Sequence, residues 1–126
     1  MGKEVKMDEK AEYLIALNQL DNVVLIDVTE VAYKAGYDYP VRFSETLYRR
    51  CVTIREGDSD ITDEDRLWMF LHGLRQNPEP PPEVCQKRWP CTFEMTDHWY
   101  FGGKLRVVRT GIAESEKNLY FLLASD

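Results

Sequence analysis

The sequence predicts an α+β domain in which N-terminal helices pack on a C-terminal three-stranded antiparallel meander. Apolar residues recur at helical spacing up to about residue 76, whereas alternating or continuous apolar runs dominate after residue 88. Between these parts, residues 77–83 contain four prolines, which end a helix and favour an extended linker. Because a chain of 126 residues has a usual size for one domain, residues 1–126 are expected to form a single domain.

The helical layer is expected to cover about residues 8–76. Its first element is a helix or helical arm over residues 8–20, where Leu14 and Leu17 recur at helical spacing after an acidic first turn. The apolar run VVLI at residues 23–26 then predicts a buried strand or an extended entry into the next helix.

The segment LIDVTEVAYKAGYDYPV contains polar residues that resemble those of an active site but have the spacing of helix signals. Asp27 stands at an N-cap position with Glu30 three residues later, as in a capping box, and Thr29 is the alternative cap. Gly36 is expected to end the helix in a left-handed conformation, and Pro40 prevents its continuation. These residues are therefore predicted to shape the backbone rather than to catalyse a reaction.

Two further helices are predicted after this segment. Ser44 is a favourable N-cap for the first, and Glu45 and Arg49 are spaced as an ion pair on its surface. Thr62 caps the second helix, which begins with three acidic residues at the positive end of the helix dipole. The second helix is apolar on most of its faces and is therefore expected to be central and buried. Its apolar residues are Leu67, Trp68, Met69, Phe70, Leu71 and Leu74.

The meander is expected to occupy residues 88–125. Its three strands are predicted at residues 88–96, 104–112 and 118–124. Gly102-Gly103 is a strong signal for a two-residue hairpin, which would place Tyr100 opposite Leu105 and Trp99 opposite Arg106. The last strand is apolar on both faces, so the helices are expected to cover it.

The net charge narrows the class of partner. With a net charge of −6, the surface disfavours nucleic acid and leaves open a basic, DNA-handling protein that an acidic surface attracts.

An odd number of cysteines argues against a disulfide scaffold, and no apolar run is long enough to span a membrane. The N-terminus also lacks the apolar region of a signal peptide. The protein is therefore expected in the cytoplasm.

Residues 23–75 resemble a family of small bacterial proteins with no assigned function, often carried by plasmids or phages. The first block, LIDVTEVAYKAGYDYPV, is similar to the family pattern V-L-[VI]-D-V-T-E-x-A-x-x-A-G-x-x-Y-P-V, and Arg66-Leu67-Trp68 matches a second block. The second block departs from its pattern at Met69-Phe70 and lacks a glycine before Arg66. The resemblance implies an origin on a mobile element but supplies no catalytic residue.

No metal, cofactor or catalytic site is expected from the spacing of the reactive residues. A calcium loop starting at Asp58 would need glycine at position 63 and glutamate at position 69, where the chain has Asp63 and Met69. Cys85 and Cys91 lie too far apart for a zinc knuckle. The positions of the two histidines in the sequence do not suggest a general base beside a cysteine or serine nucleophile.

The sequence favours a binding protein that contacts a host protein or a second copy of itself. The expected contact residues are Trp99, Tyr100, Phe101 and Arg106 near the hairpin, with the acidic Asp58 and Asp60. The alternative for the aromatic residues is that the helical layer covers them. Two other functions stay open: a metal protein or enzyme that uses the scattered cysteines and histidines, and a nucleic-acid-binding protein that uses the arginines.

Overall fold

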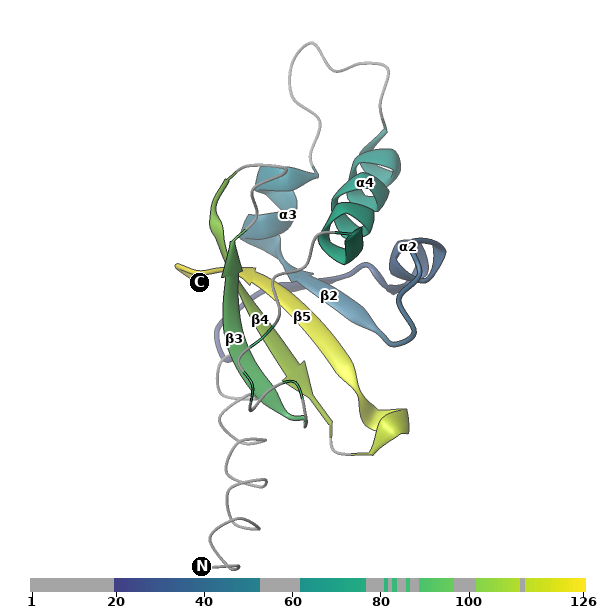
Figure 1. The fold of residues 1–126 in the computed structure, drawn as a ribbon. Helices are drawn as coiled ribbons and strands as arrows, with labels where there is room; N and C mark the ends of the chain where they lie inside the picture. Colours follow the sequence, from purple (N-terminus) through teal and green to yellow (C-terminus); the bar gives the residue numbers. More distant parts are fainter. Residues whose placement is uncertain are drawn as a thin grey trace, which may run out of the picture.

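Five strands form one mixed sheet in the order β1-β2-β5-β4-β3 in the computed structural model (Figure 1). The structure describes residues 20–52, 62–76, 81, 83, 86, 89–96, 102–111 and 113–126. In chain order the elements are β1 (Leu25–Asp27), α2 (Thr29–Lys34), β2 (Val41–Ser44), α3 (Glu45–Cys51), α4 (Asp63–Gln76), β3 (Cys91–Thr96), β4 (Lys104–Thr110), a 3₁₀ turn (Glu114–Glu116) and β5 (Asn118–Leu123). The helix expected over residues 8–20 and most of the proline-rich linker fall outside the described residues.

The predicted fold class is wrong in the size and pairing of the sheet. The meander β3-β4-β5 is present, but β1 and β2 extend it, and β2 runs parallel to β5. In the parallel pair, Phe43 lies beside Phe121. The sequence misses β2 because the strand has only four residues, from Val41 directly after Pro40 to the capping Ser44, too few for a periodic signal.

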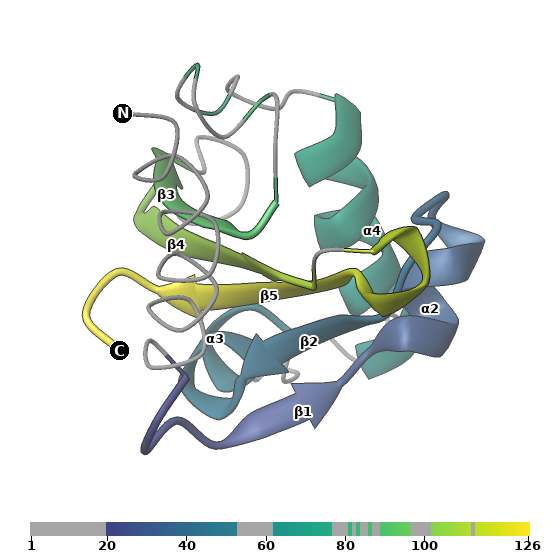
Figure 2. The same ribbon diagram turned by 90° about the horizontal axis from the view of Figure 1, so that it is seen from below.

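Three helices of the described chain pack on one face of this sheet (Figure 2). The rings of Phe70 from α4 and Phe121 from β5 both contact Phe43 edge to face, with centroids 5.6 and 5.7 Å away. This packing fixes α4 across the sheet, with Phe70, Leu71 and Leu74 directed into the core. None of the helices in the described ranges is both long and apolar enough to cross a lipid bilayer.

The opposite face of the sheet has a smaller apolar cluster. Val108, Tyr120 and Leu122 are buried there. The partly buried residues packed on this cluster are Leu20, Val23 and Leu25. Because the helix expected over residues 8–20 lies almost wholly outside the described residues, the expectation that helices cover both faces of β5 stays a prediction.

The segment 27–41 folds largely as its polar residues predict. Helix α2 starts at Thr29, whose backbone N–H donates to Asp27 Oδ1 at 2.9 Å. The capping box does not form, since Val28 occupies the N-cap and makes no side-chain cap bond. Thr29 instead bonds through its hydroxyl to the backbone N–H and C=O of Val41. Thr29 thereby ties the start of α2 to the start of β2.

Candidate functional site

The expected partner-binding residues lie mostly outside the described residues. Asp58, Asp60, Trp99, Tyr100 and Phe101 are among these, so their role stays a prediction. Arg106 is described, and its guanidinium donates to the backbone oxygens of Asp126 and Ala124 at 2.8 and 2.9 Å. Arg106 therefore holds the chain that follows β5.

The pairing of β3 with β4 overturns the predicted two-residue hairpin. Leu105 lies opposite Met95 and Arg106 opposite Glu94, rather than opposite Tyr100 and Trp99. The paired strands end at Thr96 and Lys104. The glycine pair predicted a reversal of the chain correctly but placed it too tightly, because the alternating apolar pattern ends before the glycines.

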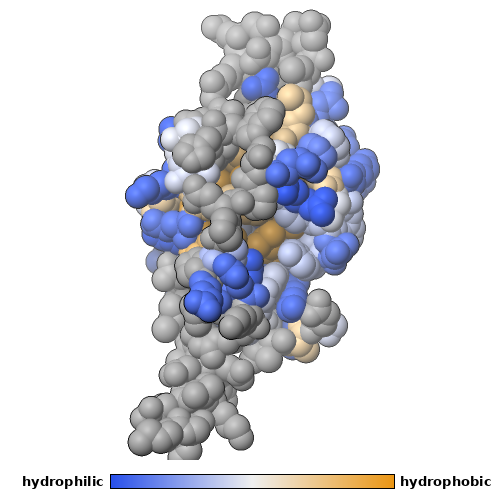
Figure 3. All heavy atoms as spheres, viewed as in Figure 1, coloured by the Kyte–Doolittle hydropathy of each residue, from blue (hydrophilic) through white to orange (hydrophobic). Residues whose placement is uncertain are grey.

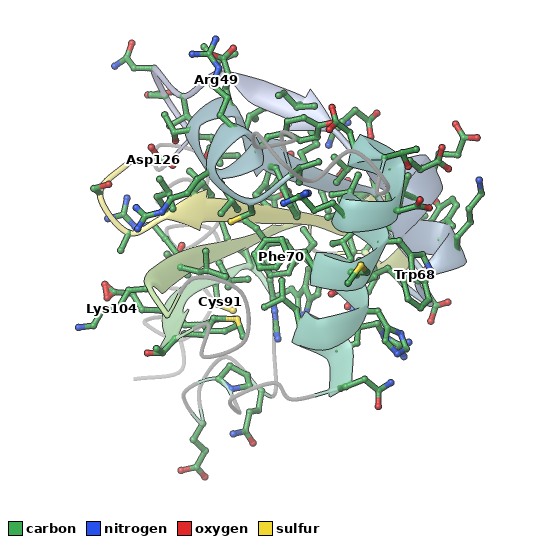
Figure 4. All side chains as sticks on the ribbon, turned by 90° about the horizontal axis from the view of Figure 1, so that it is seen from above. Arg49, Trp68, Phe70, Cys91, Lys104 and Asp126 are labelled. Atoms are coloured by element: carbon green, nitrogen blue, oxygen red, sulfur yellow. The ribbon has the colours of Figure 1, made fainter. Side chains whose placement is uncertain are left out.

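Helix α4 presents bulky side chains to solvent on the side away from the sheet. Trp68 is 37% exposed and Met69 48% exposed, whereas Phe70 is 2% exposed. Figure 4 shows Trp68 and Phe70 on opposite sides of α4. The expectation that this helix is buried nearly all round is therefore wrong. A helix packed on one face of a sheet buries one stripe, and the apolar residues beyond that stripe remain outside.

The Trp68 side chain is ordered against its neighbour one turn later. Its ring stacks on the His72 imidazole, with centroids 4.5 Å apart and planes 10° from parallel. Glu64, one turn earlier on the same face, pairs with Lys34 of α2 at 3.1 Å. We refer to Glu64, Trp68, Met69 and His72 as the outer face of α4.

An acidic depression adjoins the outer face of α4 and has a volume of about 400 Å³. It lies where the start of α2, Tyr48 of α3 and the first turn of α4 meet. Its acidic residues are Asp27, Glu30, Asp63 and Glu64. Glu64 belongs to both features, which makes them one continuous surface. Sequence reasoning assigned these acids mainly to helix capping and did not bring the two pairs together, because their convergence depends on how α2 packs against α4.

Hydrogen bonds favour the ionised form of one carboxylate of this surface. Hydrogen bonds from the side chain and backbone of Thr29 lower the pKa of Asp27. Burial raises the pKa of the Tyr48 hydroxyl, and the nearby Asp63 carboxylate raises it further. Tyr48 therefore contributes a neutral hydroxyl group among carboxylates.

The described residues form no cluster of metal-binding side chains. Cys51 and Cys91 are both buried, while His72 lies on the outer face of α4. Within the described ranges, no three side chains of His, Cys, Asp or Glu are placed to hold a metal ion. Cys85 and His98 fall outside those ranges. Asp27 and Thr29 bond to backbone groups, as expected for residues that shape the chain.

Comparison of the chain with models of protein families, with curated proteins and with solved structures gives no match in any of the three. Function is therefore inferred from the geometry of the chain itself, in which an acidic depression continues into an exposed tryptophan and methionine.

Proposed function

We propose that this protein is a non-enzymatic binding protein that docks a basic segment of a partner protein on the outer face of α4 and the acidic depression. The exposure of Trp68 and Met69 beside this depression is the observation that carries the proposal. Tryptophan is enriched among the residues that dominate interface energetics, and methionine adapts its shape to a partner.

The charge of the surface identifies the chemistry of the partner. Four carboxylates line the depression or its edge, and the whole chain carries a net charge of −6. A partner that inserts lysine or arginine there gains Coulombic attraction, and a cation can also lie over the Trp68 ring. The same charge repels a phosphate backbone, which ranks a nucleic-acid partner lower.

Two further parts of the proposal rest on the sequence. Origin on a plasmid or phage, with a host defence or DNA-handling protein as the partner, rests on the resemblance of residues 23–75 to mobile-element proteins. Function in the cytoplasm rests on the odd number of cysteines. An enzyme or metal protein is the lower-ranked alternative, and stoichiometric zinc in the purified protein would support it.

The experiment is affinity capture from the native host by the wild type and by Trp68→Ala/Met69→Ala, with bound proteins identified by mass spectrometry. The wild type is expected to retain a basic protein that the double variant loses. Because the attraction is partly electrostatic, capture should weaken between low and high salt.

Arg49→Ala is the matched control, since Arg49 is exposed and lies away from Trp68 (Figure 4). It should capture the same protein as the wild type. If the folded double variant captures the same partner as efficiently as the wild type, the outer face of α4 is not the docking site. In that case the residues around Trp99 become the next surface to test.

A further inference from the structure

A second cavity, of about 300 Å³, lies over the part of the sheet that the helices leave open. Its described lining comes from the α2–β2 connection, the C-terminal end of α4, Pro81 of the proline-rich stretch and strands β3, β4 and β5. The floor is apolar and formed by Phe93, Met95, Val107, Leu119 and Phe121. Figure 3 shows hydrophobic surface near the centre of this side of the molecule, with hydrophilic residues to its right and below it. The volume is at the small end of the range for ligand pockets.

Arg75 is held in place at the rim of this cavity. Its Nη1 donates to the backbone oxygen of Ala35 at 3.1 Å, and its guanidinium lies over the Tyr37 ring, 5.8 Å from the centroid. Tyr37 is itself fixed, because its buried hydroxyl donates to the backbone oxygen of Leu71 at 2.9 Å. A guanidinium has five N–H donors, so this anchoring leaves others for a ligand. The site is therefore preorganised, which reduces the entropic cost of binding.

Gly36 makes this position of Arg75 available. Its φ is +102°, and a Cβ atom at this position would overlap the guanidinium of Arg75. The glycine that ends α2 thus also leaves the space in which Arg75 reaches the rim.

The lining of the cavity also includes a second arginine, Arg109, which contacts aromatic rings. The Arg109 guanidinium lies 5.0 Å from the ring centroids of Phe93 and of Trp89, and Trp89 in turn contacts the ring of Tyr39. Among the described lining residues, Asp38 is the acid that accompanies Arg75 and Arg109. In a chain with a net charge of −6, these two arginines make a cationic rim around an apolar floor.

We propose that this cavity binds a small organic anion with an apolar body, such as a short-chain or single-ring carboxylate. The apolar body would lie on the floor between Phe93 and Phe121, and the carboxylate would accept hydrogen bonds from Arg75. Charge-assisted hydrogen bonds of this kind are the stronger ones in proteins. The volume limits the ligand to a small molecule. This site is separate from the outer face of α4, so the two proposals can fail independently.

The test compares three probes that share one apolar chain and differ in charge: hexanoate, hexanol and hexylammonium. Each is titrated into the ¹⁵N-labelled full chain while the backbone amide signals are followed by NMR. Hexanoate is expected to shift the signals of Gly36, Val107 and Leu119, which belong to cavity-lining residues, and to leave Arg49 unchanged. Hexanol should bind at least about tenfold more weakly than hexanoate, and hexylammonium should not bind.

Variants of Arg75 separate the anion contact from general apolar binding. Arg75→Gln should weaken hexanoate binding about tenfold and leave hexanol unchanged, whereas Arg75→Lys should retain part of the affinity. Arg49→Gln is the control that removes a distant charge. Equal binding of hexanoate and hexanol, an unchanged hexanoate affinity in Arg75→Gln, or shifts that map away from the cavity would each overturn the proposal.

Discussion

Gly36 illustrates how one residue links a local rule to a distant side chain. Its N–H donates to the Tyr33 carbonyl and that of Tyr37 to the Ala32 carbonyl, which is the Schellman end of a helix. The sequence predicts this cap because Asp-Tyr-Pro follows the glycine closely. It does not reveal that Arg75, far along the chain, occupies the space a side chain would need.

Gly36→Ala is expected to lower the free energy of unfolding by about 1–3 kcal/mol, since alanine disfavours the positive φ and would displace Arg75. Urea denaturation measures the change. Gly73→Ala is the matched control, because Gly73 lies inside α4, where alanine should stabilise by about 0.5–1 kcal/mol. Equal effects of the two changes would contradict the conformation described for Gly36.

Ser44 contributes to a helix cap and to a tertiary contact. Its Oγ accepts from the Leu47 N–H at 3.2 Å and donates to Asp126 Oδ2 at 2.6 Å. The sequence predicted the first bond from the cap rule, but the second depends on the return of the chain after β5. Because the hydroxyl is buried, its loss leaves unpaired groups behind.

We expect Ser44→Ala to destabilise the fold by about 1–3 kcal/mol in thermal or urea unfolding. Thr46→Ala removes a bond to the same carboxylate at an exposed position and should cost less. If Ser44→Ala destabilises the fold no more than Thr46→Ala does, the cap contributes little to the free energy of unfolding.

Helix α4 shows why an element can be predicted from sequence while its orientation cannot. Thr62 caps it as expected, with its Oγ1 accepting from the Asp65 N–H at 3.0 Å. The apolar run has no clear polar stripe, so periodicity gives no inward side. The sheet determines the orientation by burying Phe70 and leaving Trp68 and Met69 outside.

This orientation predicts unequal costs for neighbouring aromatic residues. Phe70→Ala should reduce the free energy of unfolding by about 3–5 kcal/mol, because it leaves a cavity beside Phe43. Trp68→Ala, two residues away, should cost about 1 kcal/mol or less, since its side chain is partly exposed and mainly stacks on His72. Urea denaturation of both variants under the same conditions compares their free energies of unfolding. Comparable losses would place Trp68 in the core and remove the basis of the proposed docking surface.

Strands β3, β4 and β5 were predictable because alternation and continuous apolar runs mark them, and neighbouring strands pair locally. Strand β2 was not, since it is short and its partner β5 lies far along the chain. The acidic depression was not predictable for the same reason. Asp27 and Glu30 are distant from Asp63 and Glu64 in sequence and meet only through the packing of α2 against α4.

At the scale of the whole molecule, Asp126 joins parts of the fold that are far apart in sequence. Its carboxylate accepts hydrogen bonds from Ser44 and Thr46, at the end of β2 and the start of α3, and from the Leu123 N–H at the end of β5. Burial alone would raise its pKa, but these hydrogen bonds and the charge of Arg106 lower it below the usual value of 3.8. The ionised form is therefore the one that holds these elements together.

This linkage predicts a loss of stability in acid. A carboxyl group whose pKa is lower in the folded than in the unfolded chain stabilises the fold above the unfolded value, and this contribution disappears as the pH falls through the folded value. The free energy of unfolding of the wild type should thus decline as the pH falls below about 4, with a further contribution from Asp27, whose pKa is also lowered.

Asp126→Asn is expected to be less stable than the wild type near neutral pH, and the difference should shrink as the pH falls through the lowered pKa of the wild-type carboxyl group. Urea denaturation across this pH range tests the expectation. Asp21→Asn is the control, because the exposed Asp21 carboxylate accepts no hydrogen bond from the part of the chain that the structure describes. The free energy of unfolding of this control should differ from that of the wild type by the same amount at every pH. A constant difference between Asp126→Asn and the wild type at every pH would show that the ionised carboxylate does not link β2, α3 and β5.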